Sequence, residues 1–152
     1  MNKENGFALL RILTGLAWAA DAGFKWMPEI RLNIINVLTQ ALAGQGTMES
    51  AWINMWVHFA NINPIFFGTL IAIVETALAI SLITGVFSRV ALYCGVLFSF
   101  LIWSVPQGFG GPYAAGNTDI DSGVIYLFLF IALILGEAWR KYNMESFFRK
   151  RS

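Results

Sequence analysis

Four stretches of nearly continuous apolar residues dominate the chain. They cover residues 6–27, 65–84, 88–106 and 119–139. About 20 helical residues, at ~1.5 Å each, span a hydrocarbon core of about 30 Å. The pattern therefore predicts an all-α fold: an integral membrane four-helix bundle that forms a single domain over residues 1–152, with a tail at 140–152.

The segment 28–64, between the first two stretches, is too long and too apolar for a simple turn. Apolar residues at helical spacing predict one short amphipathic helix around 34–42. Gly44-Gln45-Gly46 interrupts the pattern, and a second, aromatic-rich helix is predicted from Thr47 to just before Asn61. Two compatible interpretations are open: the insertion anchors the protein at the headgroup level, or it forms a lid over a cavity.

Ionisable side chains interrupt the first two apolar stretches. Arg11, Trp18, Asp21 and Lys25 follow one another at intervals of three, four or seven residues, which places them on one stripe of a helix. Glu75 lies near the middle of the second stretch, ~15 Å from either end. Because charge is costly in hydrocarbon, an intramembrane ionisable residue indicates a functional site.

Two ion pairs are expected among these side chains. Asp21 and Lys25 are four residues apart and can pair directly, and Arg11 is the predicted partner of Glu75. Either the pairs only fix the helix register, or the cluster binds a ligand or exchanges protons. Apolar packing fixes register at least as well as buried charge does, which favours the ligand or proton role.

A glycine-rich segment follows the third apolar stretch. Residues 107–113 read Gln-Gly-Phe-Gly-Gly-Pro-Tyr, and Trp103 precedes them. Glycines allow backbone angles that bring amides close to a ligand. Thr118 and Asp121 have capping-box spacing, which favours a capping role for Asp121 and predicts a fourth helix from about residue 119.

Composition and charge narrow the class of protein. Hydrophobic residues make up 57% of the chain and charged residues 12%, which excludes an ordinary soluble domain. No basic tract suits nucleic acid. One cysteine, Cys94, and one histidine, His58, exclude an internal disulfide, a cysteine-ligated iron–sulfur cluster, a bis-histidine haem and a zinc site of His and Cys alone. Electron transfer would therefore need an organic cofactor or a partner subunit.

The basic residues predict the orientation. Most Lys and Arg residues fall at one end of the four stretches, and only Lys25 and Arg31 fall at the other end. The positive-inside rule then places both termini in the cytoplasm. Segments 28–64 and 107–118 face outward.

Three segments together resemble the DoxX-like membrane proteins, and specifically the DoxD-type small subunit of thiosulfate:quinone oxidoreductase. They are 10–15 with 23–26, Glu75 with 82–89, and 108–113 with 116–119. The resemblance spans about residues 6–135, with Arg11, Lys25, Glu75 and Arg89 at the family's charged positions. It implies a multi-pass protein of a prokaryotic plasma membrane that oxidises thiosulfate to tetrathionate, reduces membrane quinone and works with a second subunit.

Residue roles follow from combining the resemblance with the chemistry of the side chains. A thiosulfate dianion would lie near Lys25 and the glycine-loop amides, and a quinone ring would stack on aromatic side chains. Glu75 or Asp21 would exchange the quinone's protons. The expected catalytic residues are Glu75, Asp21 and Arg11; the substrate-binding residues are Lys25, Trp26, Trp103, Gly110, Gly111, Tyr113 and Asp119; the quinone-binding residues are Trp18 and Tyr126.

Two other functions remain open. The chain could be a non-catalytic accessory subunit of a respiratory or oxidase complex, because it lacks redox ligands and carries strips of small residues on the second and third stretches. It could also carry a small anion, because intramembrane charges mark transport pathways as well. In every case the expected partners are the lipid bilayer and either a second subunit or further copies of the chain.

Overall fold

The computed structural model describes residues 2–113 and 120–144, and every regular element in these ranges is a helix. This confirms the all-α prediction. In chain order the elements are α1 (Lys3–Lys25), α2 (Pro28–Arg31), α3 (Ile34–Gln40), α4 (Thr47–Ile62), α5 (Pro64–Thr84), α6 (Ser88–Ser104), the 3-10 turn η1 (Gly108–Gly110) and α7 (Ser122–Leu135).

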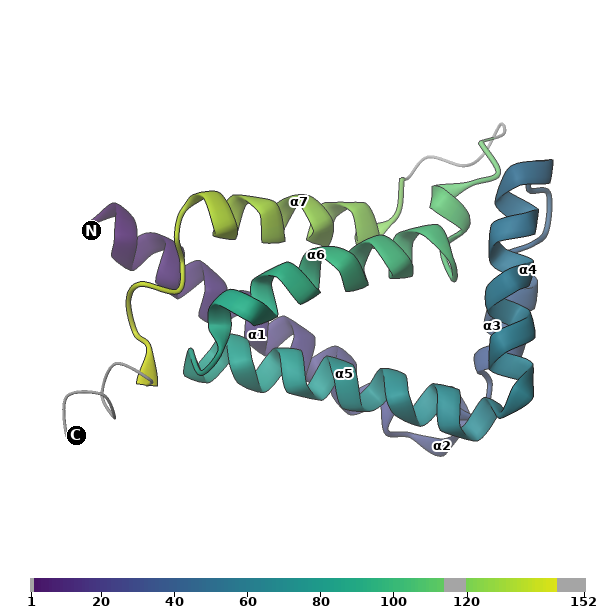
Figure 1. Cartoon of the computed structure of the whole chain (residues 1–152), viewed down its shortest axis with the longest axis horizontal. Helices are drawn as coiled ribbons and strands as arrows, with labels where there is room; N and C mark the ends of the chain where they lie inside the picture. Colours follow the sequence, from purple (N-terminus) through teal and green to yellow (C-terminus); the bar gives the residue numbers. More distant parts are fainter. Residues whose placement is uncertain (1, 114–119, 145–152) are drawn as a thin grey trace.

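The four long apolar helices form two pairs. α1 packs along α5, and α6 packs along α7, while contacts between the pairs are fewer. α4 lies across one end of these helices, and its axis is transverse to theirs (Figure 1). We call this end of the molecule the α4 end. Asn63 joins α4 directly to α5, where its side chain accepts a hydrogen bond from the Phe66 amide at 3.0 Å.

The core lies between the two helix pairs and consists of aromatic and aliphatic side chains. Its fully buried members include Leu82 of α5, Leu92 of α6, and Phe130 and Leu133 of α7. Glycines allow the helices to approach closely, because a side-chain atom on Gly15 would lie 2.9 Å from Leu82. This contact sets the antiparallel register of α1 on α5.

Gly95 on α6 provides a test of this packing. A Cβ atom at Gly95 would overlap the Phe130 ring, so Gly95→Ala is expected to destabilise the protein by about 1–3 kcal/mol through overpacking. Gly23→Ala is the matched control: nothing lies near its Cβ position in α1, and alanine is the better helix former. Thermal unfolding in detergent micelles should give a lower Tm for Gly95→Ala and an unchanged or higher Tm for Gly23→Ala. Equal Tm values would contradict the packing.

Within residues 2–113 and 120–144, two helices are long and apolar enough to cross a membrane, namely α1 with 23 residues and α5 with 21. The predicted third and fourth spans are shorter in the structure, at 17 residues in α6 and 14 in α7. α6 ends at Ser104 because Pro106 has no amide hydrogen to donate to Ile102 O, which accepts from the Gln107 amide instead. α7 begins after Asp121, whose φ of 71° is not helical, and it ends before Glu137, whose φ is 51°.

All four long helices carry large apolar side chains on their outer faces. Exposed examples are Leu13 and Leu16 of α1, Ile73 and Ile80 of α5, Val90 and Leu97 of α6, and Ile125 and Phe128 of α7. Cys94 also faces outward from α6. Apolar surface on this scale exceeds what a soluble monomer normally exposes, and it suits contact with lipid or with other apolar helices.

Candidate functional site

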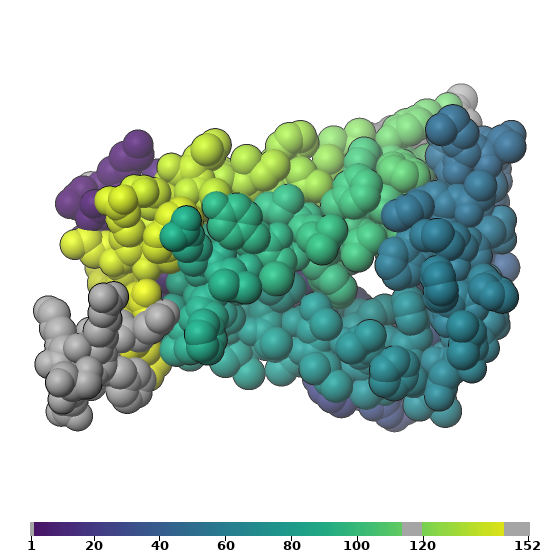
Figure 2. Space-filling view, in the orientation of Figure 1, coloured from purple at the N-terminus to yellow at the C-terminus, as the bar shows by residue number. Residues whose placement is uncertain are grey.

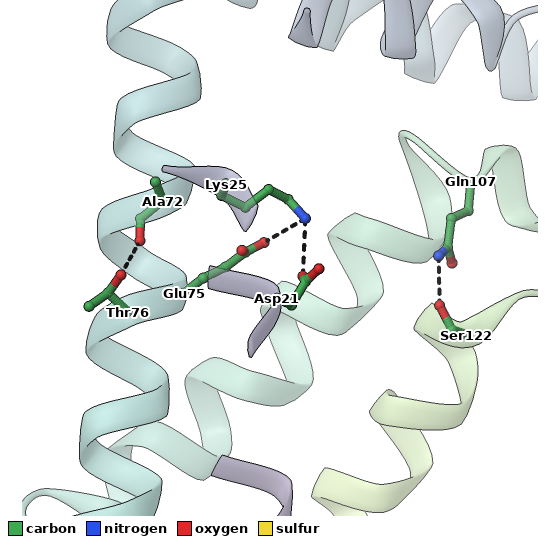
Figure 3. A network of polar contacts seen from close by, with 7 residues as sticks. All are labelled: Asp21, Lys25, Ala72, Glu75, Thr76, Gln107 and Ser122. Carbon is green, nitrogen blue, oxygen red and sulfur yellow. Dashed lines mark hydrogen bonds and ion pairs between the residues drawn. The ribbon is translucent and has the colours of Figure 1, made fainter. Parts of the chain in front are cut away.

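Asp21, Lys25 and Glu75 form a polar cluster where the C-terminal turn of α1 meets the middle of α5 (Figure 3). The Lys25 ammonium donates a hydrogen bond to Asp21 Oδ2 at 3.0 Å, and it lies 3.7 Å from Glu75 Oε1. The predicted Asp21–Lys25 pair is therefore confirmed. Lys25 also lies within ion-pair distance of Glu75, so one ammonium faces two carboxyl groups.

Glu75 is the least satisfied member of the cluster. Its side chain is 1% exposed, and neither carboxyl oxygen accepts a hydrogen bond from the part of the chain that the structure describes. Removing an ionised carboxylate from water without hydrogen bonds costs several kcal/mol, and an ammonium at 3.7 Å offsets only part of this cost. A buried group that is left unsatisfied in this way is suited to binding a ligand or a proton.

The predicted pairing of Arg11 with Glu75 is wrong. Arg11 is fully buried, and its guanidinium donates to four backbone carbonyls at the opposite end of the bundle from α4. The acceptors are Leu82 O at 2.9 Å, Ala138 O at 3.0 Å, Lys141 O at 3.3 Å and Tyr142 O at 2.8 Å. Leu82 lies two turns, or ~10 Å, beyond Glu75 along α5.

This position gives Arg11 a structural role rather than a place in the polar cluster. The last carbonyls of a helix lack partners within the helix, and a cation is favoured near them. Arg11 supplies donors to Leu82 in the last turn of α5 and to the segment that follows α7. Arg89 also matches a charged position of the DoxX-like family. It is exposed and lies against the Trp139 ring, with its Cζ atom 5.4 Å from the ring centroid.

Trp26 and Thr76 lie beside the cluster and hold α1 against α5. The Trp26 indole donates to Thr76 Oγ1 at 3.0 Å, and Thr76 in turn donates to Ala72 O at 2.7 Å. Trp26 is half-exposed and also lies under the Arg31 guanidinium, 5.9 Å from its ring centroid. The sequence analysis singled out Trp26 but missed Thr76, because a threonine in an apolar helix carries no distinctive signal.

The bundle is not fully closed at the α4 end. Figure 2 shows an opening through the molecule, bounded by α4, α5 and the end of α6. An apolar hollow of about 370 Å³ lies between α4, α6 and η1 and is lined by Met48, Glu49, Trp52, Phe100 and Phe109. The Trp52 indole spans the two walls by donating to Ser104 Oγ at 3.2 Å.

The glycine-rich segment is ordered by hydrogen bonds of its own. The amides of Gly108, Gly110 and Gly111 donate to carbonyls of the same turn, at 3.2, 2.8 and 3.0 Å. An anion would have to displace these bonds to use the amides predicted to bind it. Phe109 has a φ of 60°, and Tyr113 donates from its hydroxyl to Phe109 O.

Gln45 holds this segment against the loop between α3 and α4. Its side-chain amide donates to Gly108 O at 3.0 Å and to Gly111 O at 3.2 Å. We expect Gln45→Ala to lower stability by about 1–3 kcal/mol, because two carbonyls lose a common donor. Gln40→Ala, at an exposed position of α3, is the control and should have little effect. Hydrogen exchange would show faster exchange of the Gly110 and Gly111 amides in Gln45→Ala only. Unchanged protection would refute this role.

A second polar pair, Gln107 and Ser122, joins the ends of α6 and α7 (Figure 3). Gln107 Nε2 donates to Ser122 Oγ at 3.0 Å, and Gln107 Oε1 accepts from the Gly123 amide at 2.9 Å. Trp103 also fixes this junction, since its indole donates to Ile120 O at 2.9 Å. Asp119 and Thr118 lie outside the described residues. Asp121 directly precedes α7, so the helix begins later than the capping-box spacing predicted.

The two residues assigned to quinone, Trp18 and Tyr126, pack together in the hydrophobic core. Trp18 is 4% exposed, and its indole N–H has no hydrogen bond acceptor among the described residues. Tyr126 of α7 contacts Trp18 edge to face, with the ring centroids 5.9 Å apart. In residues 2–113 and 120–144, no three His, Cys, Asp or Glu side chains lie together in a way that could hold a metal ion.

Comparisons of the chain with protein-family models, curated proteins and solved structures gave no match.

Proposed function

We propose that this protein is a membrane-embedded, quinone-linked oxidoreductase subunit that acts on thiosulfate or a related small sulfur anion. The observation that carries the proposal is the Asp21–Lys25–Glu75 cluster. In it, a buried carboxyl group that accepts no hydrogen bond from the described residues lies beside a shared ammonium. The resemblance to DoxD-type subunits supplies the substrate class. The reaction joins two thiosulfate ions through a new S–S bond, and the two electrons released, with two protons, reduce quinone to quinol.

The electrostatics of the cluster constrain how an anion could bind. With Asp21 and Glu75 both ionised, the acidic groups outnumber the single ammonium, and a dianion would be repelled. A protonated Glu75 removes that repulsion and becomes a hydrogen bond donor to the anion, with Lys25 providing the attraction. Glu75 thus holds a proton while the substrate is bound and can release it to the reaction.

The proposed membrane arrangement has four spans, formed by α1, α5, α6 and α7, in a prokaryotic plasma membrane with both termini cytoplasmic. The apolar outer faces of these helices support it. The lengths of α6 and α7 correspond to about 25 and 21 Å, which a locally thinned bilayer and the flanking residues can accommodate. α4 would then lie in the plane of the outer surface.

Quinone reduction by the purified protein tests the function, with thiosulfate as donor and with and without candidate partner subunits. Lys25→Met should abolish the reduction, while Lys141→Met, which removes a lysine of the exposed Lys141–Glu4 pair, should leave it unchanged. A wild-type protein that binds no quinone and accelerates no reduction in either setting would overturn the proposal.

A non-catalytic accessory subunit is the second candidate, and the extensive apolar outer faces of α5 and α6 favour it. Such faces could pack against a larger membrane complex as well as against lipid. Purification from native membranes under mild conditions separates the two cases. Recovery of the chain alone, or only with copies of itself, would exclude the accessory role.

A further inference from the structure

We propose that Lys25 is a proton relay between the exposed Asp21 and the buried Glu75. The side-chain exposures fall in order along this path, from 53% at Asp21 to 31% at Lys25 and 1% at Glu75. The relay rests on the function proposed above in that it delivers the protons that the reaction at Glu75 exchanges. These protons come from the water in contact with Asp21.

The geometry needs only a small movement of one side chain. The Lys25 ammonium is hydrogen-bonded to Asp21 at 3.0 Å, and a shift of well under 1 Å toward Glu75 Oε1, now at 3.7 Å, would form the second hydrogen bond. Lys25 then transfers one proton to the Glu75 carboxylate, leaving a neutral amine and a carboxylic acid. Asp21 takes up a proton from the solvent and passes it to the amine, which restores the Asp21 carboxylate and the Lys25 ammonium. The charge of the cluster has then risen by one.

A static ion pair would have a different geometry. If the cluster only neutralised charge, the ammonium would bind most closely to the carboxylate that water cannot reach. Instead it hydrogen-bonds to the exposed carboxylate at 3.0 Å and stays 3.7 Å from the buried one, whose oxygens accept no hydrogen bond from the described residues. α5 packs against α1, α2, α3, α4 and α6. Among the described residues, the charged groups that act on Glu75 across these contacts are Lys25 and Asp21.

Lys25→Arg distinguishes a relay from an ion pair. Arginine keeps the positive charge and the hydrogen bond donors, but its guanidinium does not release a proton in proteins. The full-length protein in lipid nanodiscs would be subjected to a rapid pH jump and followed by time-resolved infrared spectroscopy. The signal is the carbonyl stretch of protonated Glu75, identified as the band that Glu75→Gln removes. Lys141→Arg makes the same chemical change at the exposed pair with Glu4 and is the control.

We expect the Glu75 band to respond at the same rate in wild type and Lys141→Arg, and at least about 100-fold more slowly in Lys25→Arg. Asp21→Asn should also slow the response, because it removes the exposed proton acceptor. A wild-type response rate in Lys25→Arg would overturn the relay, as would a wild-type protein without the band at any pH. Neither donor nor quinone is present in this measurement, so it can fail or succeed independently of thiosulfate oxidation.

Discussion

Arg11→Ala is expected to destabilise the protein more than any other single substitution in α1, by about 3–5 kcal/mol. The side chain is fully buried and donates to carbonyls from α5 and from the segment after α7. Alanine would leave these carbonyls buried without a donor and would open a cavity of guanidinium size. The measurement is reversible unfolding in mixed micelles, with helicity as the signal.

Two further variants show which property of Arg11 matters. Arg11→Lys keeps the charge, but all the N–H donors of lysine lie on one nitrogen and cannot reach carbonyls on both α5 and the segment after α7. This variant should therefore recover only a minor part of the lost stability. Lys141→Ala removes the Lys141 side chain but keeps the backbone carbonyl that accepts from Arg11, so the stability of the protein should hardly change. Stability of Arg11→Ala equal to that of wild type would show that the carbonyls find other donors.

The structural role of Arg11 illustrates what sequence patterns predict and what they leave open. A spacing of seven residues, close to two helical turns, placed Arg11, Trp18 and Lys25 on one stripe, and the (i, i+4) rule gave the Asp21–Lys25 pair. Both predictions depend only on the geometry of one helix. The partner of Arg11 depends on the register between two helices. That register is set by the close contact of Gly15 with Leu82, which no local pattern predicts.

The glycine-rich segment shows a second limit of the same kind. Its composition predicted unusual backbone angles, and Gly108 and Gly110 do have positive φ values of 52° and 80°. The sequence could not show that the glycine amides would donate hydrogen bonds within the turn. Nor could it show that Gln45, more than 60 residues earlier, would donate to the glycine carbonyls. Long-range hydrogen bonds of this kind depend on the tertiary arrangement, and a lone glutamine in a loop gives no signal of them.

Glu75→Gln is expected to lower activity by a factor of about 10²–10⁴, the usual contribution of a positioned proton donor. The amide has nearly the same shape as the carboxyl group, so the packing around α5 should be retained. It cannot take up a proton for the reaction, and it leaves Lys25 paired with Asp21 alone. The assay is thiosulfate-dependent quinone reduction, with the helical content of each variant recorded in parallel.

The stability of Glu75 variants decides between function and scaffold. A structural residue stabilises the fold, and its replacement should cost stability. If Glu75 is instead retained for chemistry, replacing it by methionine, which is of similar length, should leave stability unchanged or raise it by about 1–4 kcal/mol, because an unsatisfied buried carboxyl group is removed. Lys25 keeps its 3.0 Å hydrogen bond to Asp21 in this variant, so no ammonium is stranded. Loss of activity together with equal or greater stability identifies Glu75 as a functional residue. Full activity in Glu75→Gln, or a large loss of stability in Glu75→Met, would instead assign it to the scaffold.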